Sequence, residues 1–198
     1  MSKYLSQKEA LEQIKADIIK SNICPDLAQT ATQLVMGHGN TDADIVFIGE
    51  APGKQEDISG IPFVGAAGKL LDEMLSSINL LRSDVYVTNI VKYRPPNNRD
   101  PLPDEKKAFW PYLLRELKVI KPKVIITLGR HSMGNFLPDV SISNVHGKLF
   151  KAMMKDPDSE EDVEINILPL YHPAAALYNG ALRQTLFNDF LIIKKITN

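Results

Sequence analysis

The sequence predicts an α/β fold, a three-layer α/β/α sandwich whose central sheet of about four strands is mainly parallel. Short apolar runs alternate along the chain with segments of helical periodicity, and strands that alternate with helices form parallel sheets covered on both faces. Three of the apolar runs end in polar residues and a proline turn. Because the carboxyl ends of parallel strands meet at one edge of a sheet, we expect these three turns to build one site.

The composition is that of an ordinary globular protein. The chain has 198 residues, 44% hydrophobic and 24% charged, which suits one domain with a sizeable core over residues 1–198. It contains no apolar run of about 18 residues or more and no signal-peptide core, so we expect no membrane contact and a cytoplasmic location. A formal net charge of −1 argues against a general polyanion binder. Contact with nucleic acid must then rest on local basic clusters.

Helical periodicity marks both ends of the chain and its middle. The first helix is expected after Ser6, which forms a capping-box signature with Glu9 and precedes apolar residues at helical spacing. The same spacing predicts three further helices, over residues 70–78, 104–117 and 186–196. A shorter helix is expected after Gly129. Pro111 is expected to kink or split its helix, because proline lacks the amide hydrogen.

Short apolar runs mark the strands. Four of them predict the central sheet, over residues 45–48, 85–88, 124–128 and 165–170. The acidic run from Asp156 to Asp162 separates two extended segments and is expected to form a solvated hairpin loop. We find no internal repeat, low-complexity tract or interdomain linker.

Three of these runs lead into residues suited to chemistry on a base. Glu50 stands in the motif GEAPG, Asn89 in TNIVKYRPPNNR and His172 in YHPAA. A carboxylate can orient a water or stabilise a developing cation, an amide can meet a donor and an acceptor together, and an imidazole can stabilise a leaving group. Each residue type alone is more often structural, and the combination of motifs favours a functional site.

These motifs, with PFVG between the first two, resemble those of the uracil-DNA glycosylase superfamily, most closely its family 4, over roughly residues 21–195. The resemblance implies a monofunctional enzyme that hydrolyses the N-glycosidic bond of uracil in DNA and leaves an abasic site. It assigns Glu50 to the hydrolytic step and to base selection, and His172 to a hydrogen bond with uracil O2. Asn89 would then select uracil over cytosine. Four further uracil contacts are implied, at Gly49, Ala51, Gly53 and Phe63, the last of which would stack on the base.

A second group of residues is expected to contact the DNA backbone or groove: Gly65, Lys92, Arg94, Arg99, Pro173, Leu177 and Arg183. Gly65 opens a helix whose free amides can bind phosphate, and the basic loop after Asn89 suits phosphate positioning. Leu177 lies where the superfamily inserts a wedge into the gap left by an extruded nucleotide, with an ordinary core position as its alternative. The remaining histidines stand in no comparable motif: His38, His131 and His146.

Cys24 is the only cysteine in the chain, and a lone thiol can form neither an internal disulfide nor a metal cluster. Family 4 enzymes usually carry four cysteines around an iron–sulfur cluster. The resemblance aligns Cys24 with the second ligand and places other residues at the remaining three, namely Ser21, Tyr93 and Phe109. We therefore expect no cluster and no metal, with the two aromatic residues filling its place by burial.

The expected partner is uracil-containing DNA, double- or single-stranded, bound by a monomer that associates with the nucleoid. Two alternatives stay open: a DNA-binding or repair-scaffold module with little catalysis, and a glycosylase for another deaminated base such as hypoxanthine. Retention of Glu50, Asn89 and His172 together speaks against the first. A related branch traps the sugar covalently through a histidine in an insertion after the asparagine motif, but the interval KYRPPNNRDPLPDE contains no histidine. Hydrolysis is therefore expected.

Overall fold

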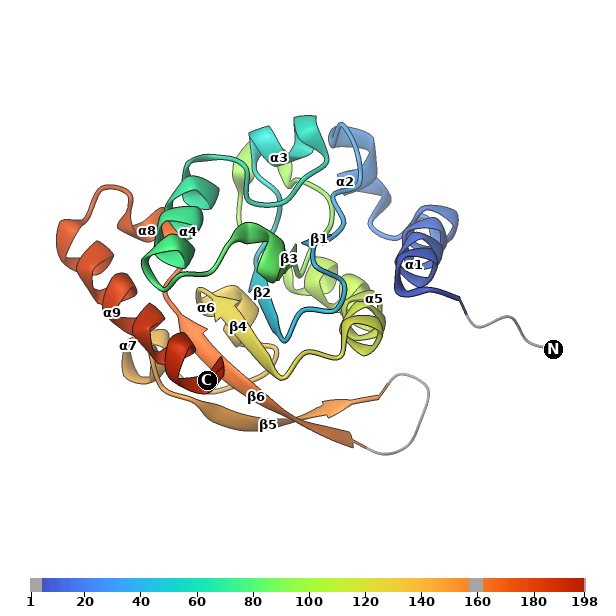
Figure 1. Cartoon of the computed structure of the whole chain (residues 1–198). Helices are drawn as coiled ribbons and strands as arrows, with labels where there is room; N and C mark the ends of the chain where they lie inside the picture. The colour runs from blue at the N-terminus through green and yellow to red at the C-terminus, as the bar shows by residue number, and fades with distance from the viewer. Residues whose placement is uncertain (1–4, 157–161, 198) are drawn as a thin grey trace.

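The structure is a computed structural model that describes residues 5–156 and 162–197. Within these residues a mixed sheet of six strands forms the centre, in the order β1-β3-β2-β4-β6-β5 (Figure 1). The strands are β1 (His38–Gly39), β2 (Ile45–Gly49), β3 (Tyr86–Asn89), β4 (Val124–Leu128), β5 (Phe150–Lys155) and β6 (Asp162–Leu170).

The four expected strands form the parallel centre of the sheet, β3-β2-β4-β6. The expected number of about four strands omitted the two edge strands, β1 and β5, which pair antiparallel. Neither edge strand has a continuous apolar run, because β1 is two residues long and β5 alternates between half-buried and exposed positions. The hairpin loop expected between Asp156 and Asp162 falls on residues 157–161, outside the described residues, although β5 and β6 pair as a hairpin would.

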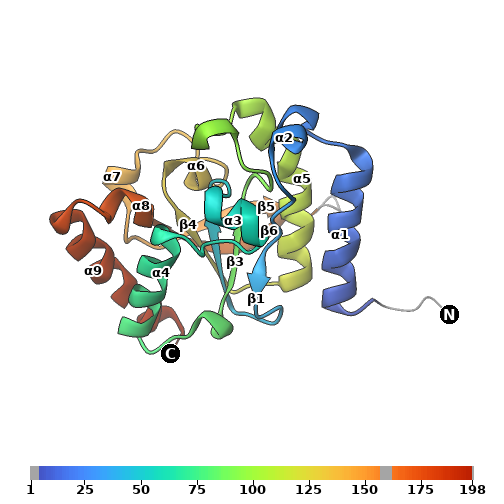
Figure 2. The same cartoon turned by 90° about the horizontal axis from the view of Figure 1, so that it is seen from above.

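Helices cover both faces of this sheet, as Figure 2 shows from above. They are α1 (Gln7–Ser21), α2 (Pro25–Thr30), α3 (Lys54–Ser59), α4 (Ala66–Ser77), α5 (Pro103–Ile120), α6 (Arg130–Met133), α7 (Ile142–Val145), α8 (Pro173–Ala176) and α9 (Gly180–Thr197), with 3₁₀ turns η1 (Arg82–Asp84) and η2 (Pro96–Asn98). Helices α4, α8 and α9 contribute to the core on one face, and α1, α2 and α5 to the core on the other. The expected three-layer arrangement is confirmed.

Local sequence explains where the long helices begin and end. The capping box at the start of α1 is present, since the Ser6 amide donates to Glu9 Oε2 at 2.8 Å and the Glu9 amide donates to Ser6 Oγ at 3.3 Å. Helix α5 runs unbroken from Pro103 to Ile120, so the expected split at Pro111 does not occur. Pro111 lies on the exposed side of α5, where water can replace the lost backbone hydrogen bond.

The central strands are buried on both faces, which explains their continuous apolar runs. Along β2, Phe47 belongs to one core cluster, whereas Val46 and Ile48 belong to the other. The Phe47 ring stacks on Phe190 of α9 with centroids 5.8 Å apart. None of the helices in the two described ranges has the length and apolarity needed to cross a membrane.

Parallel register brings the functional motifs to one edge of the sheet. Gly49 at the end of β2 pairs with Asn89 at the end of β3, and Leu128 at the end of β4 pairs with Leu170 at the end of β6. The segments that follow these four strands therefore leave the sheet side by side.

Candidate active site

A cavity of about 330 Å³ lies at this carboxyl edge, within the size range of small-ligand sites. Its wall includes Glu50 just after β2, Asn89 at the end of β3, Phe63 from the loop before α4, and His172 after β6. The three turns expected to converge do lie together. The wall also contains four more residues expected from the sequence, Ala51, Gly53, Gly65 and Arg99.

Asn89 faces the cavity with an unused acceptor. Its side chain is buried, with 2% exposure, and its Oδ1 has no hydrogen-bond partner among the described residues. A buried acceptor left unpaired costs about 1–3 kcal/mol, so the pocket favours a ligand that brings a donor to this atom. Gly49 makes the approach possible, because a Cβ there would lie 2.4 Å from Asn89 Oδ1 and 2.5 Å from Phe63 Cζ.

Phe63 forms one wall of the cavity in an unusual backbone conformation. Its φ is 56°, in the left-handed region that non-glycine residues seldom adopt. The Arg82 guanidinium donates to the Pro62 carbonyl oxygen at 2.7 Å and so holds the preceding residue. The Phe63 ring stacks against His172 with centroids 5.8 Å apart and planes inclined by 30°. The ring is therefore fixed at the wall with its orientation set by the loop.

His172 lies at the start of α8 and is held in one tautomer. Its Nδ1 accepts a hydrogen bond from the Ala174 amide at 3.1 Å, so the proton of the neutral ring is on Nε2. Burial, together with the nearby His131, lowers the pKa of His172 to about 4. At neutral pH the side chain is an uncharged donor at the cavity wall.

Glu50 combines a mostly buried position with a high proton affinity. Its side chain is 23% exposed, and its Oε1 is buried without a hydrogen bond in the described part of the chain. Burial, and then the neighbouring Asp100, raise the pKa of Glu50 from 4.5 to about 7, against the opposing effect of Lys106 and Arg130. Near neutrality this carboxyl can therefore both take up and release a proton.

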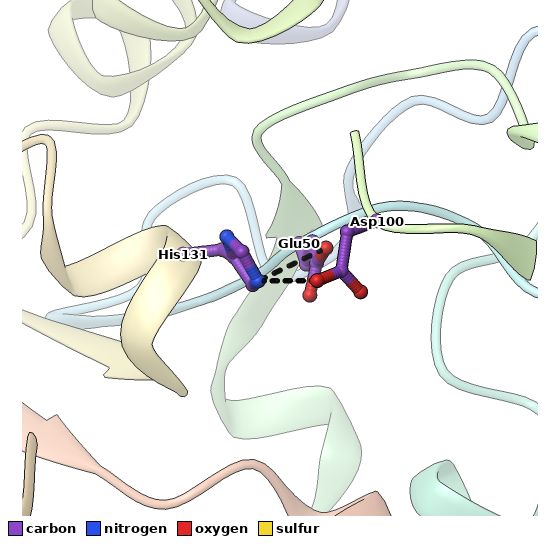
Figure 3. A group of neighbouring side chains, drawn as sticks. All are labelled: Glu50, Asp100 and His131. Atoms are coloured by element: carbon purple, nitrogen blue, oxygen red, sulfur yellow. Dashed lines mark hydrogen bonds and ion pairs between the residues drawn. The ribbon is translucent and has the colours of Figure 1, made fainter. Parts of the chain in front are cut away.

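Two residues not expected from the sequence, Asp100 and His131, lie beside Glu50 (Figure 3), and Asp100 also lines the cavity. His131 Nε2 lies 3.7 Å from Glu50 Oε1 and 3.1 Å from Asp100 Oδ2. Burial lowers the pKa of His131 below its usual value. His131 was set aside because it stands in no motif, but it follows β4 directly, as the other site residues follow their strands. The end of that fourth strand was the signal that could have identified it.

Among the described residues, Glu50, Asp100 and His131 are the group whose carboxylate and imidazole atoms come close enough to hold a metal, all within 4.8 Å of one another. The Arg130 guanidinium already supplies a positive charge there. Its Nη2 donates to Asp100 Oδ2 and its Nε to His131 Nε2, both at 3.1 Å. We therefore treat the three residues as a hydrogen-bonded and electrostatic cluster and assign no metal to them.

Lys92 does not lie with the other basic residues expected at the DNA surface. Its side chain is fully buried, and its Nζ lies 2.5 Å from Glu116 Oε2 and 2.6 Å from Thr88 Oγ1. Tyr86 also donates to Glu116, at 2.8 Å. A phosphate contact would leave Glu116 buried and unpaired, which is strongly unfavourable, so Lys92 supports the strand end beneath the site instead.

The other two basic residues of this loop remain at the surface. Arg94 is half-buried and donates to Asn98 Oδ1 at 2.7 Å. Arg99 is part of the cavity wall and forms a bidentate ion pair with Glu105 at 2.9 and 2.5 Å. Arg99 is therefore placed where an anion in the cavity would meet it, and Arg94 holds Asn98, another residue of the cavity wall.

Gly65 caps the start of α4, but part of its anion site is already filled. Glu56 Oε1 accepts from the Val64 and Gly65 amides at 3.0 and 2.8 Å. The next two residues of the helix, Ala66 and Ala67, line the cavity. An anion at this helix start would therefore use amides beyond those bound by Glu56.

The segment expected to enter the groove is divided between core and surface. Pro173 is buried, and Leu177 is partly buried against the core of the α4 and α9 face, which matches the core alternative. Its neighbour Tyr178 is 98% exposed. Arg183 forms an ion pair with Glu73 of α4 and lies over the Phe187 ring, so it links α9 to its neighbours.

The position implied for an iron–sulfur cluster is packed with aromatic side chains. Phe109 is fully buried and Tyr93 nearly so, and their rings meet edge to face with centroids 6.0 Å apart. Cys24 packs against the same core cluster, and Ser21 is exposed at the end of α1. One thiol among these four positions is not a ligand set for a cluster held by cysteine thiolates, so the residues present do not fit that group.

Comparison with known proteins agrees with this geometry. The family model described as the uracil DNA glycosylase superfamily matches residues 36–192. A protein of Archaeoglobus fulgidus named type-4 uracil-DNA glycosylase is 46% identical over 187 residues, which cover 92% of this chain and 90% of the relative. Its namesake in Sulfurisphaera tokodaii is 47% identical over 194 residues, 95% and 85% of the two chains. The one in Thermotoga maritima is 38% identical over 188 residues, 93% of each.

The matched region contains the four parallel strands and the whole cavity wall, including Glu50, Asn89 and His172. Cys24 lies before it. The resemblance seen in the sequence motifs is confirmed over most of the length of both chains. This chain therefore belongs to the uracil DNA glycosylase superfamily.

Proposed function

We propose that this protein is a monofunctional uracil-DNA glycosylase that hydrolyses the N-glycosidic bond of uracil in DNA and leaves an abasic site. The observation that carries the proposal is the unpaired, buried Oδ1 of Asn89 in the same cavity as Phe63 and the Nε2–H of His172. These groups offer an acceptor, an aromatic face and a neutral donor to one flat ring. The type-4 names of the relatives support the choice of substrate.

Recognition of uracil would follow from hydrogen-bond complementarity. Asn89 can accept from uracil N3–H at Oδ1 and donate to O4 through its amide group. Cytosine presents an acceptor at N3 and donors at N4, so both pairs would be mismatched inside a buried site. Stacking on Phe63 adds about 1–3 kcal/mol without distinguishing between bases.

Bond cleavage would create negative charge on the departing uracil, near His172, and positive charge on the sugar, near Glu50. The electron pair of the bond between C1′ and N1 leaves with uracil, and the Nε2–H of His172 stabilises the negative charge on its O2. Glu50 in its carboxylate form stabilises the cationic sugar and takes a proton from the attacking water. The water oxygen forms the new bond to C1′, which completes hydrolysis without a covalent enzyme intermediate.

The surface around the cavity suits DNA held by a few phosphate contacts. Arg99 lines the cavity and Arg94 is hydrogen-bonded to Asn98 of its wall, so both would contact phosphates, and the amides at the start of α4 offer a further anion site. Leu177 would help to close the gap left by the extruded nucleotide from its partly buried position, next to the exposed Tyr178. We propose that a monomer of one domain, residues 1–198, binds double- or single-stranded DNA in this way inside the cell.

We also propose that the enzyme works without an iron–sulfur cluster. None of the steps above uses a metal, and the aromatic contact between Tyr93 and Phe109 supplies packing at the implied cluster position. Purified protein should show no visible iron–sulfur absorption. An iron content near four atoms per chain with such absorption would contradict this part of the proposal.

A cleavage assay tests the substrate. Labelled oligonucleotides containing U opposite G, U opposite A, single-stranded U, T opposite G and hypoxanthine are incubated with the protein and a chelator. We expect cleavage at uracil alone. Cleavage at hypoxanthine but not uracil would favour the other-base glycosylase, and binding without cleavage would favour the scaffold module.

Two variants test the assigned roles. Asn89→Ala should slow single-turnover uracil cleavage about 10- to 100-fold. It should also reduce the preference for uracil over cytosine, because the variant lacks the amide that would hydrogen-bond uracil N3–H and O4. His172→Gln should lower the rate about 100- to 1,000-fold with little change in DNA affinity, because its donor acts chiefly on developing charge. Asn188→Ala on the exposed side of α9 is the matched control. Wild-type rates in Asn89→Ala and His172→Gln would remove the proposed roles.

A further inference from the structure

Glu50 and Asp100 line the cavity, and His131 lies beside both carboxylates. The side chains of Glu50 and His131 are 23% and 21% exposed, whereas that of Asp100 is 63% exposed. Figure 3 shows the His131 ring directed at both carboxylates, which reach it from separate loops. His131 comes from α6, after β4, so the three residues meet only through the fold.

Hydrolysis creates a need for such a path. If Glu50 takes a proton from the attacking water, the carboxylate must lose that proton before the next turnover. Its Oε1 is buried and has no hydrogen bond to another described residue. With a base and sugar in the cavity, His131 Nε2 can accept the proton from this oxygen, which lies 3.7 Å away. Catalytic hydrogen bonds are often long in the absence of substrate and shorten when it binds.

The neutral His131 ring is oriented as a proton acceptor. Arg130 Nε donates to His131 Nε2 at 3.1 Å, so Nε2 carries a lone pair in this arrangement. Asp100 Oδ2 lies 3.1 Å from the same nitrogen. Once protonated, Nε2 can donate to Asp100, and Arg130 keeps its separate hydrogen bond to Asp100 through Nη2.

We propose that His131 and Asp100 form a relay that carries to solvent the proton Glu50 takes from the attacking water. The inference rests on the proposed hydrolytic function. An O–H bond of the water breaks as its oxygen bonds to C1′, and the proton moves to the Glu50 carboxylate, then to His131 Nε2, then through Asp100 to bulk water. Uracil leaves with the electron pair of the broken bond. His131 and Asp100 act through Glu50 and are positioning residues.

The surrounding charges act on the proton affinities of both Glu50 and His131. The pKa of Glu50 is raised to about 7, and the pKa of His131 is lowered from 6.5 by burial and by nearby cations, while Asp100 raises both. The titratable and charged groups that face the pair from other elements are Asp100, Lys106 of α5, Arg130 of α6 and His172 beside α8. Lys106 and Arg130 favour ionised Glu50 and oppose a charge on His131.

Chemical rescue tests the relay. His131→Ala should reduce uracil cleavage roughly 10- to 100-fold at pH 7, and added imidazole should restore the rate in proportion to its concentration. A purely structural loss would not respond to imidazole. The matched control is His38→Ala, since His38 is an exposed histidine on β1. This variant should cleave uracil at the wild-type rate, and added imidazole should not change that rate.

A titration followed by NMR of ¹⁵N-labelled imidazole rings tests the coupling without relying on activity. Asp100→Asn should lower the pKa of His131, because it removes a negative charge beside Nε2. The signal of His38 should titrate unchanged. Rescue of His131→Ala together with the shift in Asp100→Asn supports the relay, and absence of either overturns it.

The two proposals fail in distinguishable ways. A wild-type protein that does not cleave uracil would refute the proposed function, and the relay with it. A wild-type protein that cleaves uracil, with no rescue or no shift in the His131 titration, would refute the relay alone. The NMR experiment would still report whether His131 and Asp100 interact.

Discussion

Gly68 lies directly against the backbone of Phe63: a Cβ on Gly68 would stand 1.8 Å from the Phe63 carbonyl oxygen. Gly68 is in the first turn of α4, and Phe63 enters that turn with a positive φ. The close approach therefore fixes both the loop and the ring that forms the cavity wall. Besides standing at the start of a helix, Gly68 allows the backbone of Phe63 to pack closely against α4.

Gly68→Ala should consequently displace Phe63. We expect the free energy of unfolding to fall by about 1–3 kcal/mol, the usual effect of overpacking, and uracil cleavage to fall as the ring leaves its place. Urea denaturation and single-turnover cleavage measure the two effects. Gly180→Ala is the control, because nothing lies within 4 Å of the added Cβ. Equal stability and activity in the two variants would show that the loop does not depend on this contact.

The buried ion pair beneath Asn89 gives a stability prediction. Lys92→Met should lower the free energy of unfolding by about 3–5 kcal/mol, since it leaves the Glu116 carboxylate buried without its cation. The double variant Lys92→Met/Glu116→Gln should recover at least half of that loss, because the amide is uncharged and still accepts from Tyr86. Denaturant unfolding of the three proteins measures the coupling.

The same double variant tests whether Lys92 contacts DNA. Its DNA affinity should show the wild-type dependence on salt, whereas Arg94→Ala should reduce the slope of log K against log salt by about 0.9. A slope reduced by Lys92→Met/Glu116→Gln would mean that Lys92 leaves its buried partner to bind phosphate.

Glu50 gives a prediction about stability and pH. The folded state raises the pKa of Glu50 from 4.5 to about 7, so between these values the folded protein holds a proton that the unfolded chain releases. This group therefore lowers stability as pH rises from about 4.5 to 7, by at most about 3 kcal/mol. Glu50→Gln removes the effect, and its stability relative to wild type should grow over this range and then level off. A difference that is the same at pH 5 and pH 8 would contradict the raised pKa.

The aromatic contact at the implied cluster position gives a paired comparison. Phe109→Ala should lower the free energy of unfolding by about 3–5 kcal/mol, as expected for a large ring lost from a core. Cys24→Ser should change it by less than about 1 kcal/mol, because Cys24 is only partly buried. Thermal unfolding with and without chelator measures both. Large destabilisation by Cys24→Ser, or by chelator, would indicate that the thiol holds a metal.

Patterns within a few residues were sufficient for most of the fold. The four central strands were predicted because strands buried on both faces require continuous apolar runs. The capping box of α1 was predicted because both of its partners lie within one turn. The edge strands were not counted, because their pairing depends on partners distant in sequence and leaves little local pattern.

The positions of Lys92 and His131 could not be predicted from local sequence patterns. Lys92 reads as a phosphate contact within its basic loop, but its buried partner, Glu116, is 24 residues away on α5. His131 reads as an isolated histidine, but β4 brings it beside Glu50 and Asp100. The interaction partners of Lys92 and His131 cannot be predicted from the residues next to them in sequence.

By itself the sequence determined the alternation of strands and helices, the common edge of the sheet and the chemical types gathered there. The strands and helices can be predicted because buried positions repeat with the period of each element. The common edge can be predicted because helices between successive strands make those strands parallel. Only the tertiary structure decided which charges are paired, which acceptor remains unpaired, and that Phe63 holds a left-handed turn against Gly68. Electrostatic energies and close contacts depend on distances of a few ångströms between segments far apart in the chain, and only folding sets those distances.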